Sequence, residues 1–249
     1  MLKKITFAIE KNKTINYLSM SKNKNKQVSE DNFENLEEVL SKTEQYIENN
    51  QKKLTTIALG IVLIAVAVFA YQKYYAAPLE KRAQDQLFQA QRYFEQDSFK
   101  LALNGDENYP GFLDITDEFG STAAGNLSYY YAGISYLRIG EFQKAIDFLE
   151  GFSSDDFILS SLSKAAIGDA YMELGDNDKA AASYMEASSF NANSFTTPIY
   201  LQKAGIAYEM IGDYQNALSA YQTIEKDFSK SPEARDVEKY ITHAKLMMK

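Results

Sequence analysis

The chain has 249 residues, a formal net charge of −8, one histidine and no cysteine. The lack of cysteine excludes disulfide bonds, thiolate metal sites and a lipid attached to a cysteine. The acidic balance argues against nucleic acid as a partner, because proteins that bind nucleic acid carry basic patches.

The N-terminal segment is polar and divides into two parts. Residues 1–28 are rich in Lys and Asn and have almost no apolar periodicity, which predicts a disordered tail. Met20, which precedes SKNKNK, is a second candidate start site within this tail. From Ser29 onward an acidic first turn follows a serine cap, and apolar residues recur near helical spacing. This pattern predicts an amphipathic helix over 29–53.

The stretch LTTIALGIVLIAVAVFAY begins at Leu54 and contains no charged residue. It is apolar on all sides, and about 20 apolar residues in a helix are long enough to cross the hydrocarbon core of a bilayer. Lysines precede it, and Lys73, Tyr74 and Tyr75 follow it, as is typical of membrane interfaces. A cleaved secretory signal is the alternative, but such signals have shorter apolar cores. We therefore predict a transmembrane helix over 54–72, with membrane lipid around it.

The charges on the two sides of this helix predict its orientation. The preceding tail carries ten lysines and eight acidic residues, a net charge of +2. Removing this tail and Lys73 from the chain total of −8 leaves −11 on residues 74–249. Because basic segments stay in the cytoplasm, we predict a single-pass protein with residues 29–53 cytoplasmic and the acidic C-terminal domain on the other side of the membrane.

Three segments after the apolar stretch repeat one pattern. Each has a Gly, a Tyr three residues later, a second Gly four residues further on and an Ala five after that; the copies are offset by 35 and 37 residues. A small residue lets two helices approach closely, and a glycine readily ends a helix in a left-handed turn, so the pattern predicts helical hairpins. The positions are Gly133, Tyr136, Gly140 and Ala145; Gly168, Tyr171, Gly175 and Ala180; and Gly205, Tyr208, Gly212 and Ala217.

This pattern resembles the tetratricopeptide repeat (TPR), whose period is about 34 residues. The tryptophan typical of the start of that repeat is replaced by Tyr129, Lys164 and Leu201. The resemblance implies an all-α fold, a TPR-like α-solenoid of helical hairpins after the transmembrane helix. Within a domain over 73–249, we expect repeats near 126–159, 161–195 and 198–230, a weaker copy near 83–103, and a capping helix over 232–247.

Other local signals complete this domain. In the weaker copy, Asp97 stands where the turn glycine belongs. The sequence FLDITDEFG predicts a short helix that ends at Gly120. Ser231 followed by Pro232 is a strong start signal for the capping helix.

No pattern in the sequence predicts catalysis. The single histidine, His243, falls in the capping helix and is expected at the surface. Pairs of acidic residues such as Asp155 and Asp156 fall in turns, where Asp caps helices, rather than in a cluster that could bind a metal. The chain has no GxxxxGK phosphate-binding loop. We therefore expect no enzyme activity, no cofactor, no metal and no nucleic acid partner.

In TPR proteins the first helix of each repeat lines a concave groove, which implies a partner-binding groove here. The expected residues make this groove apolar and acidic, and flexible Met with rigid Tyr suits tolerant binding of extended apolar segments. Packing between repeats is the alternative role for each of them. Recognition of a C-terminal carboxylate is not expected, because Tyr130 and Ile134 replace the Lys, Arg and Asn used for it. The expected groove residues are Tyr130, Ile134, Leu137, Asp169, Met172, Glu173, Ile206, Glu209 and Met210.

The layout of short charged tail, apolar helix and degenerate repeats resembles the YfgM-type membrane-anchored repeat proteins of Gram-negative bacteria, from about Thr43 to the C-terminus. This resemblance implies an ancillary subunit of a SecYEG-type translocon in a bacterial inner membrane, with the C-terminal domain in the periplasm. Its partners would be periplasmic chaperones or prolyl isomerases and the unfolded secretory polypeptides that it holds. Two other functions stay open: a structural scaffold for another envelope complex, and a cytoplasm-facing adaptor of inverted topology.

Overall fold

The computed structural model describes residues 44–190 and 192–249. Helices account for most of these residues, and none of them forms a β-strand. The prediction of an all-α fold is therefore confirmed. The predicted disordered tail, the second candidate start site Met20 and residues 29–43 of the predicted amphipathic helix lie outside the described residues.

The chain divides into two compact units, Met1–Ala70 and Tyr71–Lys249. The described part of the first unit is α-helical throughout. It belongs to a helix of 52 residues, Glu44–Glu95, that includes an 18-residue window with a mean hydropathy of 2.5 and no buried residue. A helix of this length and composition is sufficient to cross a membrane. The predicted transmembrane segment, 54–72, lies within it.

The second unit begins with a local change of helical pitch. Residues Gln72–Ala76 form one π-helical turn, η1, where the apolar stretch ends, and Tyr71 stacks on Tyr75 with ring centroids 5.3 Å apart. Such turns insert an extra residue into an α-helix without ending it. The α-helix then resumes as α2, Ala77–Glu95, and Pro78, which has no N–H to donate to the preceding turn, lies where the pitch changes.

An N-terminal hairpin, formed by α2 and α3 (Phe99–Asn104), corresponds to the weaker repeat copy. Asp97 lies in the turn between these helices with φ 55°, a left-handed conformation that Asp tolerates better than most residues. The short helix α4, Phe112–Phe119, follows as predicted. Its apolar face packs against α2 and the next helix, and the rings of Phe112 and Tyr131 stack at 5.3 Å.

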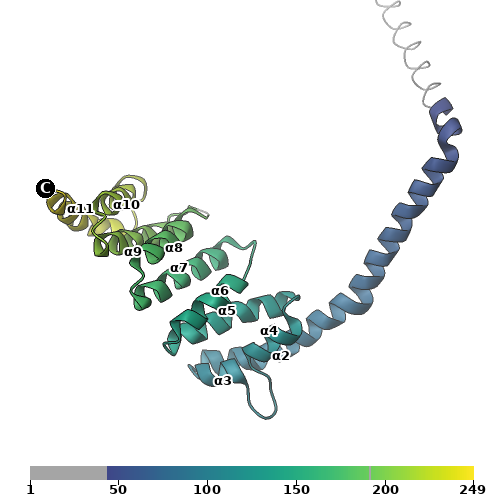
Figure 1. Cartoon of the computed structure of the whole chain (residues 1–249), viewed down its shortest axis with the longest axis horizontal. Helices are drawn as coiled ribbons and strands as arrows, with labels where there is room; N and C mark the ends of the chain where they lie inside the picture. The colour runs from purple at the N-terminus through teal and green to yellow at the C-terminus, as the bar shows by residue number, and fades with distance from the viewer. Residues whose placement is uncertain (1–43, 191) are drawn as a thin grey trace, which may run out of the picture. The chain divides into compact units, whose positions relative to one another are not determined.

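Three longer hairpins follow, stacked one after another (Figure 1). Their turns lie at the three predicted glycines, Gly140, Gly175 and Gly212, whose φ values are 82°, 76° and 76°. A side chain rarely adopts this conformation, which explains glycine at these positions. The hairpins are α5 (Ala123–Arg138) with α6 (Phe142–Gly151), α7 (Phe157–Leu174) with α8 (Asn177–Ser189), and α9 (Thr197–Met210) with α10 (Tyr214–Asp227).

The glycine inside each first helix sets the close packing of its hairpin. A Cβ added at Gly168 would lie 2.7 Å from Cδ1 of Tyr184, and one added at Gly205 would lie 2.3 Å from Cε1 of Tyr221. Gly133 faces Leu149 in the same way, at 2.5 Å. The repeated glycine is therefore explained by a large side chain of the second helix that fills its place.

The capping helix begins later than predicted. Residues Glu233–Arg235 form a 3₁₀ turn, η2, and the α-helix α11 extends over Val237–Met247. Ser231 does cap this start, since its hydroxyl accepts a hydrogen bond of 3.2 Å from the N–H of Ala234. Asp236, with φ −111° and ψ 0°, interrupts the α-helical path between the two segments. The predicted helix over 232–247 is therefore wrong in its first five residues.

Candidate functional site

A groove of 730 Å³ lies across the first helices of the three hairpins. Seven of the nine residues expected from the sequence line it. Glu209 and Met210 do not. The lining also includes residues that the sequence did not indicate. The expected members are Tyr130, Ile134, Leu137, Asp169, Met172, Glu173 and Ile206, and the additional ones are Arg138, Leu162, Ala165, Ala166, Tyr184, Tyr200 and Lys203.

Helical spacing explains how these side chains share one face. On α5, Tyr130, Ile134 and Leu137 follow each other at intervals of four and three residues, which places them on one side of the helix. The lining residues of α7 and α9 recur with the same spacing. All three named side chains are partly exposed, so their apolar surface is available to a partner.

A polar cluster occupies the middle of the groove. The hydroxyl of Tyr184 donates a hydrogen bond of 2.5 Å to Oδ1 of Asp169, and Nζ of Lys203 lies 2.7 Å from the same oxygen. The Lys203 ammonium also lies 5.4 Å from the centroid of the Tyr184 ring, within range of a cation–π contact. Burial raises the pKa of Tyr184, and its hydrogen bond to Asp169 raises it further. Tyr184 therefore stays protonated as a donor at physiological pH.

The groove is not acidic overall, contrary to expectation. Arg138 of α5 and Lys203 of α9 add two positive charges to the lining, which balance Asp169 and Glu173. Both basic residues lie on the same face of their helices as the apolar lining residues, and the sequence pattern did not indicate them. Tyr184 was missed for a different reason, because it comes from α8, a second helix, and passes between the first helices.

Two tyrosines form aromatic walls of the groove. Tyr130 packs against Phe152 and Tyr131, with ring centroids 5.4 and 5.7 Å apart. Burial raises the pKa of Tyr130, and burial likewise raises the pKa of Tyr200. Both rings are therefore neutral at physiological pH and present apolar surface together with a hydrogen-bonding hydroxyl.

Glu209 and Met210 lie outside the groove, at the end of the array. The carboxylate of Glu209 is 3.2 Å from Nδ1 of His243 in α11, and its side chain is largely covered. Met210, next to it, is 61% exposed but is not part of the groove lining. The capping helix takes the position of a further repeat, so it contacts the part of α9 that would otherwise extend the groove.

A second depression, of 540 Å³, lies among α6, α7 and α8. Its lining includes the ion pair of Lys164 with Glu186, and the Lys164 ammonium lies 5.9 Å from the centroid of the Phe190 ring. This pair engages two of the four charged side chains that line the depression. The larger groove, by contrast, extends over all three hairpins and is the better candidate for binding a protein segment.

Within residues 44–190 and 192–249, no group of three or more His, Asp or Glu side chains is placed to hold a metal ion. The groove lining combines partly exposed aliphatic and aromatic side chains with paired charges. Surfaces of this kind are suited to reversible contact with another polypeptide.

Comparison with protein families identifies the hairpins. Residues 127–155 and 200–231 match one family model of the tetratricopeptide repeat, and residues 163–194 match a second. Each of the three hairpins therefore matches a tetratricopeptide repeat model. TPR arrays are protein–protein interaction modules that bind through extended concave surfaces.

The TPR-containing part of the chain is also similar to solved structures. Two crystal structures of the nearly identical TPR-like repeats of a kinesin light chain-like protein from Podosopora anserina, one of them a single-residue variant, superpose with TM-scores of 0.47 and 0.46. Each is 15% identical in sequence and covers 67% of this chain and 86% of its own. No curated protein sequence matches this chain.

Proposed function

We propose that this protein is a membrane-anchored interaction module whose groove binds an extended, mainly apolar segment of a protein partner. The observation that carries this proposal is the groove across three tetratricopeptide repeats, with apolar walls and a polar cluster at its centre. Its volume is within the range of about 300–1,000 Å³ that is typical of binding sites.

The chemistry of the groove favours a segment with alternating apolar and polar contacts. Ile134, Met172 and Ile206 offer apolar surface from three successive repeats, and methionine adapts to irregular shapes. Asp169 and Lys203 can exchange their mutual contact for hydrogen bonds to a partner backbone, because both are more than one third exposed. Affinity is modest in this account, since binding must offset the ordering of the partner segment.

Membrane anchoring is the second part of the proposal. The exposed window of mean hydropathy 2.5 within Glu44–Glu95 supports a single span, and the acidic balance of residues 74–249 supports a location of the repeats outside the cytoplasm. A C-terminal alkaline phosphatase fusion would then be active. An inactive fusion together with a fluorescent cytoplasmic reporter would contradict this topology and favour the cytoplasm-facing adaptor.

The resemblance to YfgM-type proteins supplies the identity of the partners. We propose an ancillary subunit of the Sec translocon in the bacterial inner membrane, with repeats in the periplasm that hold emerging secretory polypeptides and meet a periplasmic chaperone or prolyl isomerase. A scaffold for another envelope complex is the alternative, and it would bind one folded partner and no secretory chain.

Purification of the full chain in detergent, with mass spectrometry of the proteins that accompany it, separates these functions. We expect translocon components and secretory chains with the parent protein and with the control Met210→Asp, which lies outside the groove. The double change Ile134→Asp and Met172→Asp is expected to lose the secretory chains, because it places charge on the apolar walls. A single folded partner in all preparations would favour the scaffold, and a lack of both translocon and chaperones would contradict the Sec assignment.

A further inference from the structure

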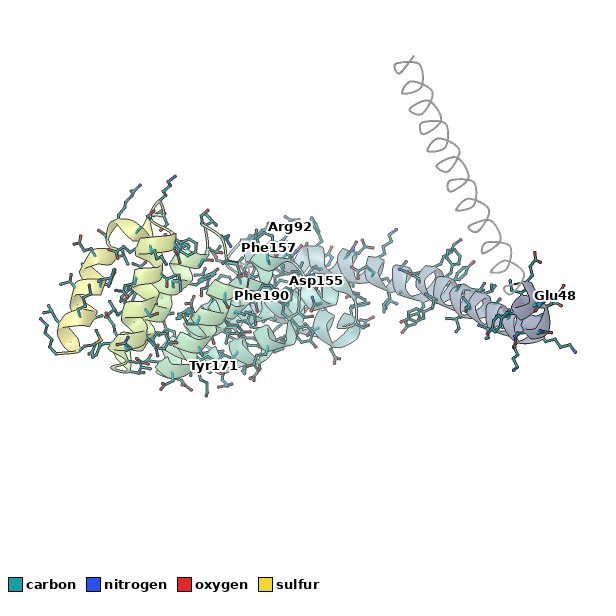
Figure 2. The ribbon with its side chains drawn as sticks, turned by 90° about the horizontal axis from the view of Figure 1, so that it is seen from above. Glu48, Arg92, Asp155, Phe157, Tyr171 and Phe190 are labelled. Carbon is teal, nitrogen blue, oxygen red and sulfur yellow. The ribbon has the colours of Figure 1, made fainter. Side chains whose placement is uncertain are left out.

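One edge of the repeat domain carries exposed aromatic and aliphatic side chains. This edge, called here the loop edge, comprises the first turns of α5, α7 and α9 together with residues 152–156, 190 and 192–196 of the connections between the hairpins. Four large apolar side chains on it are solvent-exposed in the described structure: Phe157 (42%), Ile158 (47%), Phe190 (48%) and Phe195 (78%). Tyr171, near the other end of α7, lies apart from Phe157 and Phe190 in Figure 2.

Hydrogen bonds hold the connections of the loop edge in place. The side chain of Asn126, in the first turn of α5, donates to the carbonyl of Ser153 at 2.6 Å and accepts from the Ser153 N–H at 3.1 Å. The hydroxyl of Ser160 in α7 donates to the carbonyl of Ser154 at 2.6 Å. The hydroxyl of Thr197 in α9 donates to the carbonyl at the end of α8, at 3.1 Å. The exposed apolar side chains are therefore presented by a fixed framework.

The second unit of the chain begins at this same edge. Glu80, in the first turn of α2, accepts hydrogen bonds from the N–H groups of Ala123 and Ala124, at 2.7 and 3.2 Å. These two residues open α5, so α2 and α5 start side by side, and the two helices pack together along their length (Figure 1). The residues just before α2 include Tyr74 and Tyr75, which are exposed, and the chain continues from them directly into the apolar stretch.

We infer that the loop edge rests on the surface of the bilayer, with Phe157, Ile158, Phe190 and Phe195 inserted among the lipid headgroups. This inference rests on the proposed membrane anchoring, because the chain enters the repeat unit at this edge directly after the predicted span. Aromatic side chains are enriched at membrane interfaces, where they bury apolar surface at headgroup depth. The contact orients the groove relative to the membrane, so that a partner emerging at the bilayer meets it from a fixed direction.

The acidic residues near the loop edge indicate which lipid headgroups it can contact. Asp155 and Asp156 precede Phe157, and residues 74–249 carry a net charge of −11. Attraction to anionic headgroups is therefore not the driving force, and the contact depends on apolar insertion into a zwitterionic surface. A carboxylate at headgroup depth needs hydrogen-bond donors. That of Asp156 caps α7 and accepts hydrogen bonds from the N–H groups of Ile158 and Leu159 at 2.8 and 3.1 Å.

The chain contains no tryptophan, so single tryptophans report on single positions. We would prepare the full chain in phosphatidylcholine vesicles with and without brominated acyl chains, and compare three variants. Val66→Trp reports on the span, Phe195→Trp on the loop edge, and Leu174→Trp on the opposite edge, where α7 ends at another exposed apolar side chain. Circular dichroism would verify that each variant keeps the helical content of the parent.

We expect roughly twofold lower emission in brominated vesicles for Val66→Trp and Phe195→Trp, and no change for Leu174→Trp, because bromine quenches only rings that enter the lipid. Quenching at Val66→Trp without quenching at Phe195→Trp would overturn the inference and leave the anchor in place. Emission from Phe195→Trp that is shifted to the blue but unquenched would mean that a protein or a second copy covers the edge, which also overturns it. Unquenched Val66→Trp would remove the anchoring itself.

Discussion

Tyr184 of α8 donates a 2.5 Å hydrogen bond to Asp169 of α7, and the same carboxylate oxygen receives Lys203 of α9 at 2.7 Å. One carboxylate thus joins both helices of the second repeat to the first helix of the third. Because this cluster also lies in the groove, the packing between these repeats and the chemistry of the groove depend on the same three side chains.

The hydroxyl of Tyr184 is expected to contribute to stability, whereas that of its counterpart Tyr221 is not. Tyr221 also fills the space opposite a helix glycine, but its buried hydroxyl makes no hydrogen bond of normal geometry in the part of the chain that the structure describes, although the nearby Glu209 carboxylate helps to raise its pKa. Tyr184→Phe should lower the free energy of unfolding by about 1–3 kcal/mol, since its partner is charged, and Tyr221→Phe should not lower it. Urea unfolding of the full chain in detergent micelles measures both. Equal losses would contradict the assigned hydrogen bond.

Replacing the glycine within a first helix by a larger residue should destabilise the protein. In Gly168→Leu the new side chain would overlap the ring of Tyr184, because even a Cβ lies 2.7 Å from Cδ1 of that ring. We expect a loss of about 1–3 kcal/mol in the free energy of unfolding. Ser219→Leu, at an exposed position of α10, is the control and should melt like the parent protein. A Gly168→Leu protein with unchanged melting would show that the two helices do not pack closely.

The left-handed backbone conformation of the hairpin turns predicts that two substitutions, Gly175→Ala and Asp97→Gly, change stability in opposite directions. Gly175 has φ 76°, so Gly175→Ala should lower the free energy of unfolding by about 1–2 kcal/mol. Asp97 has φ 55° in the corresponding turn of the first hairpin, so Asp97→Gly should relieve strain and raise the melting temperature. Thermal unfolding followed by circular dichroism compares the two. A lower melting temperature for Asp97→Gly would mean that the carboxylate has a role beyond the turn.

Alkaline pH should destabilise the repeats through their tyrosines. Burial is the largest cause of a raised pKa at Tyr130, Tyr184, Tyr200, Tyr208 and Tyr221. In the unfolded chain these groups ionise near their ordinary pKa of about 10, while the folded chain keeps them protonated. Their contribution to stability is therefore complete below pH 10 and is lost as pH rises above it.

Absorbance at 295 nm, which follows tyrosinate, checks this dependence. The buried hydroxyls should ionise together with the loss of helical circular dichroism, and the double change Tyr184→Phe with Tyr221→Phe should shift the transition to higher pH. Ionisation of all tyrosines before any loss of helix would contradict the burial described for these rings.

Local signals in the sequence were sufficient to predict the hairpins. They predicted only part of the groove lining. Gly140, Gly175 and Gly212 could be placed in turns because the conformation they adopt is open mainly to glycine. The start of α11 was misplaced because a serine followed by proline opens a 3₁₀ turn as readily as an α-helix, and nothing local to Ser231 distinguishes the two.

The groove required knowledge of contacts between repeats. Glu209 was expected in it by its position on α9, but the sequence does not reveal that α11 folds back to bring His243 beside it. Arg138 and Lys203 were missed because a basic residue on an apolar helical face has no local signature of its role. Tyr184 could not be predicted from the first helices, since it reaches the groove from a second helix, α8.

Site-specific photocrosslinking tests the central claim, that the groove across the three repeats binds a protein segment. Ile206 and Met210 lie on the same helix, but only Ile206 lines the groove. With benzoylphenylalanine at each position in cells, we predict capture of secretory chains or periplasmic partners at Ile206, weakened by Ile134→Asp, and little capture at Met210. Equal capture at both positions, or none at Ile206, would contradict the account.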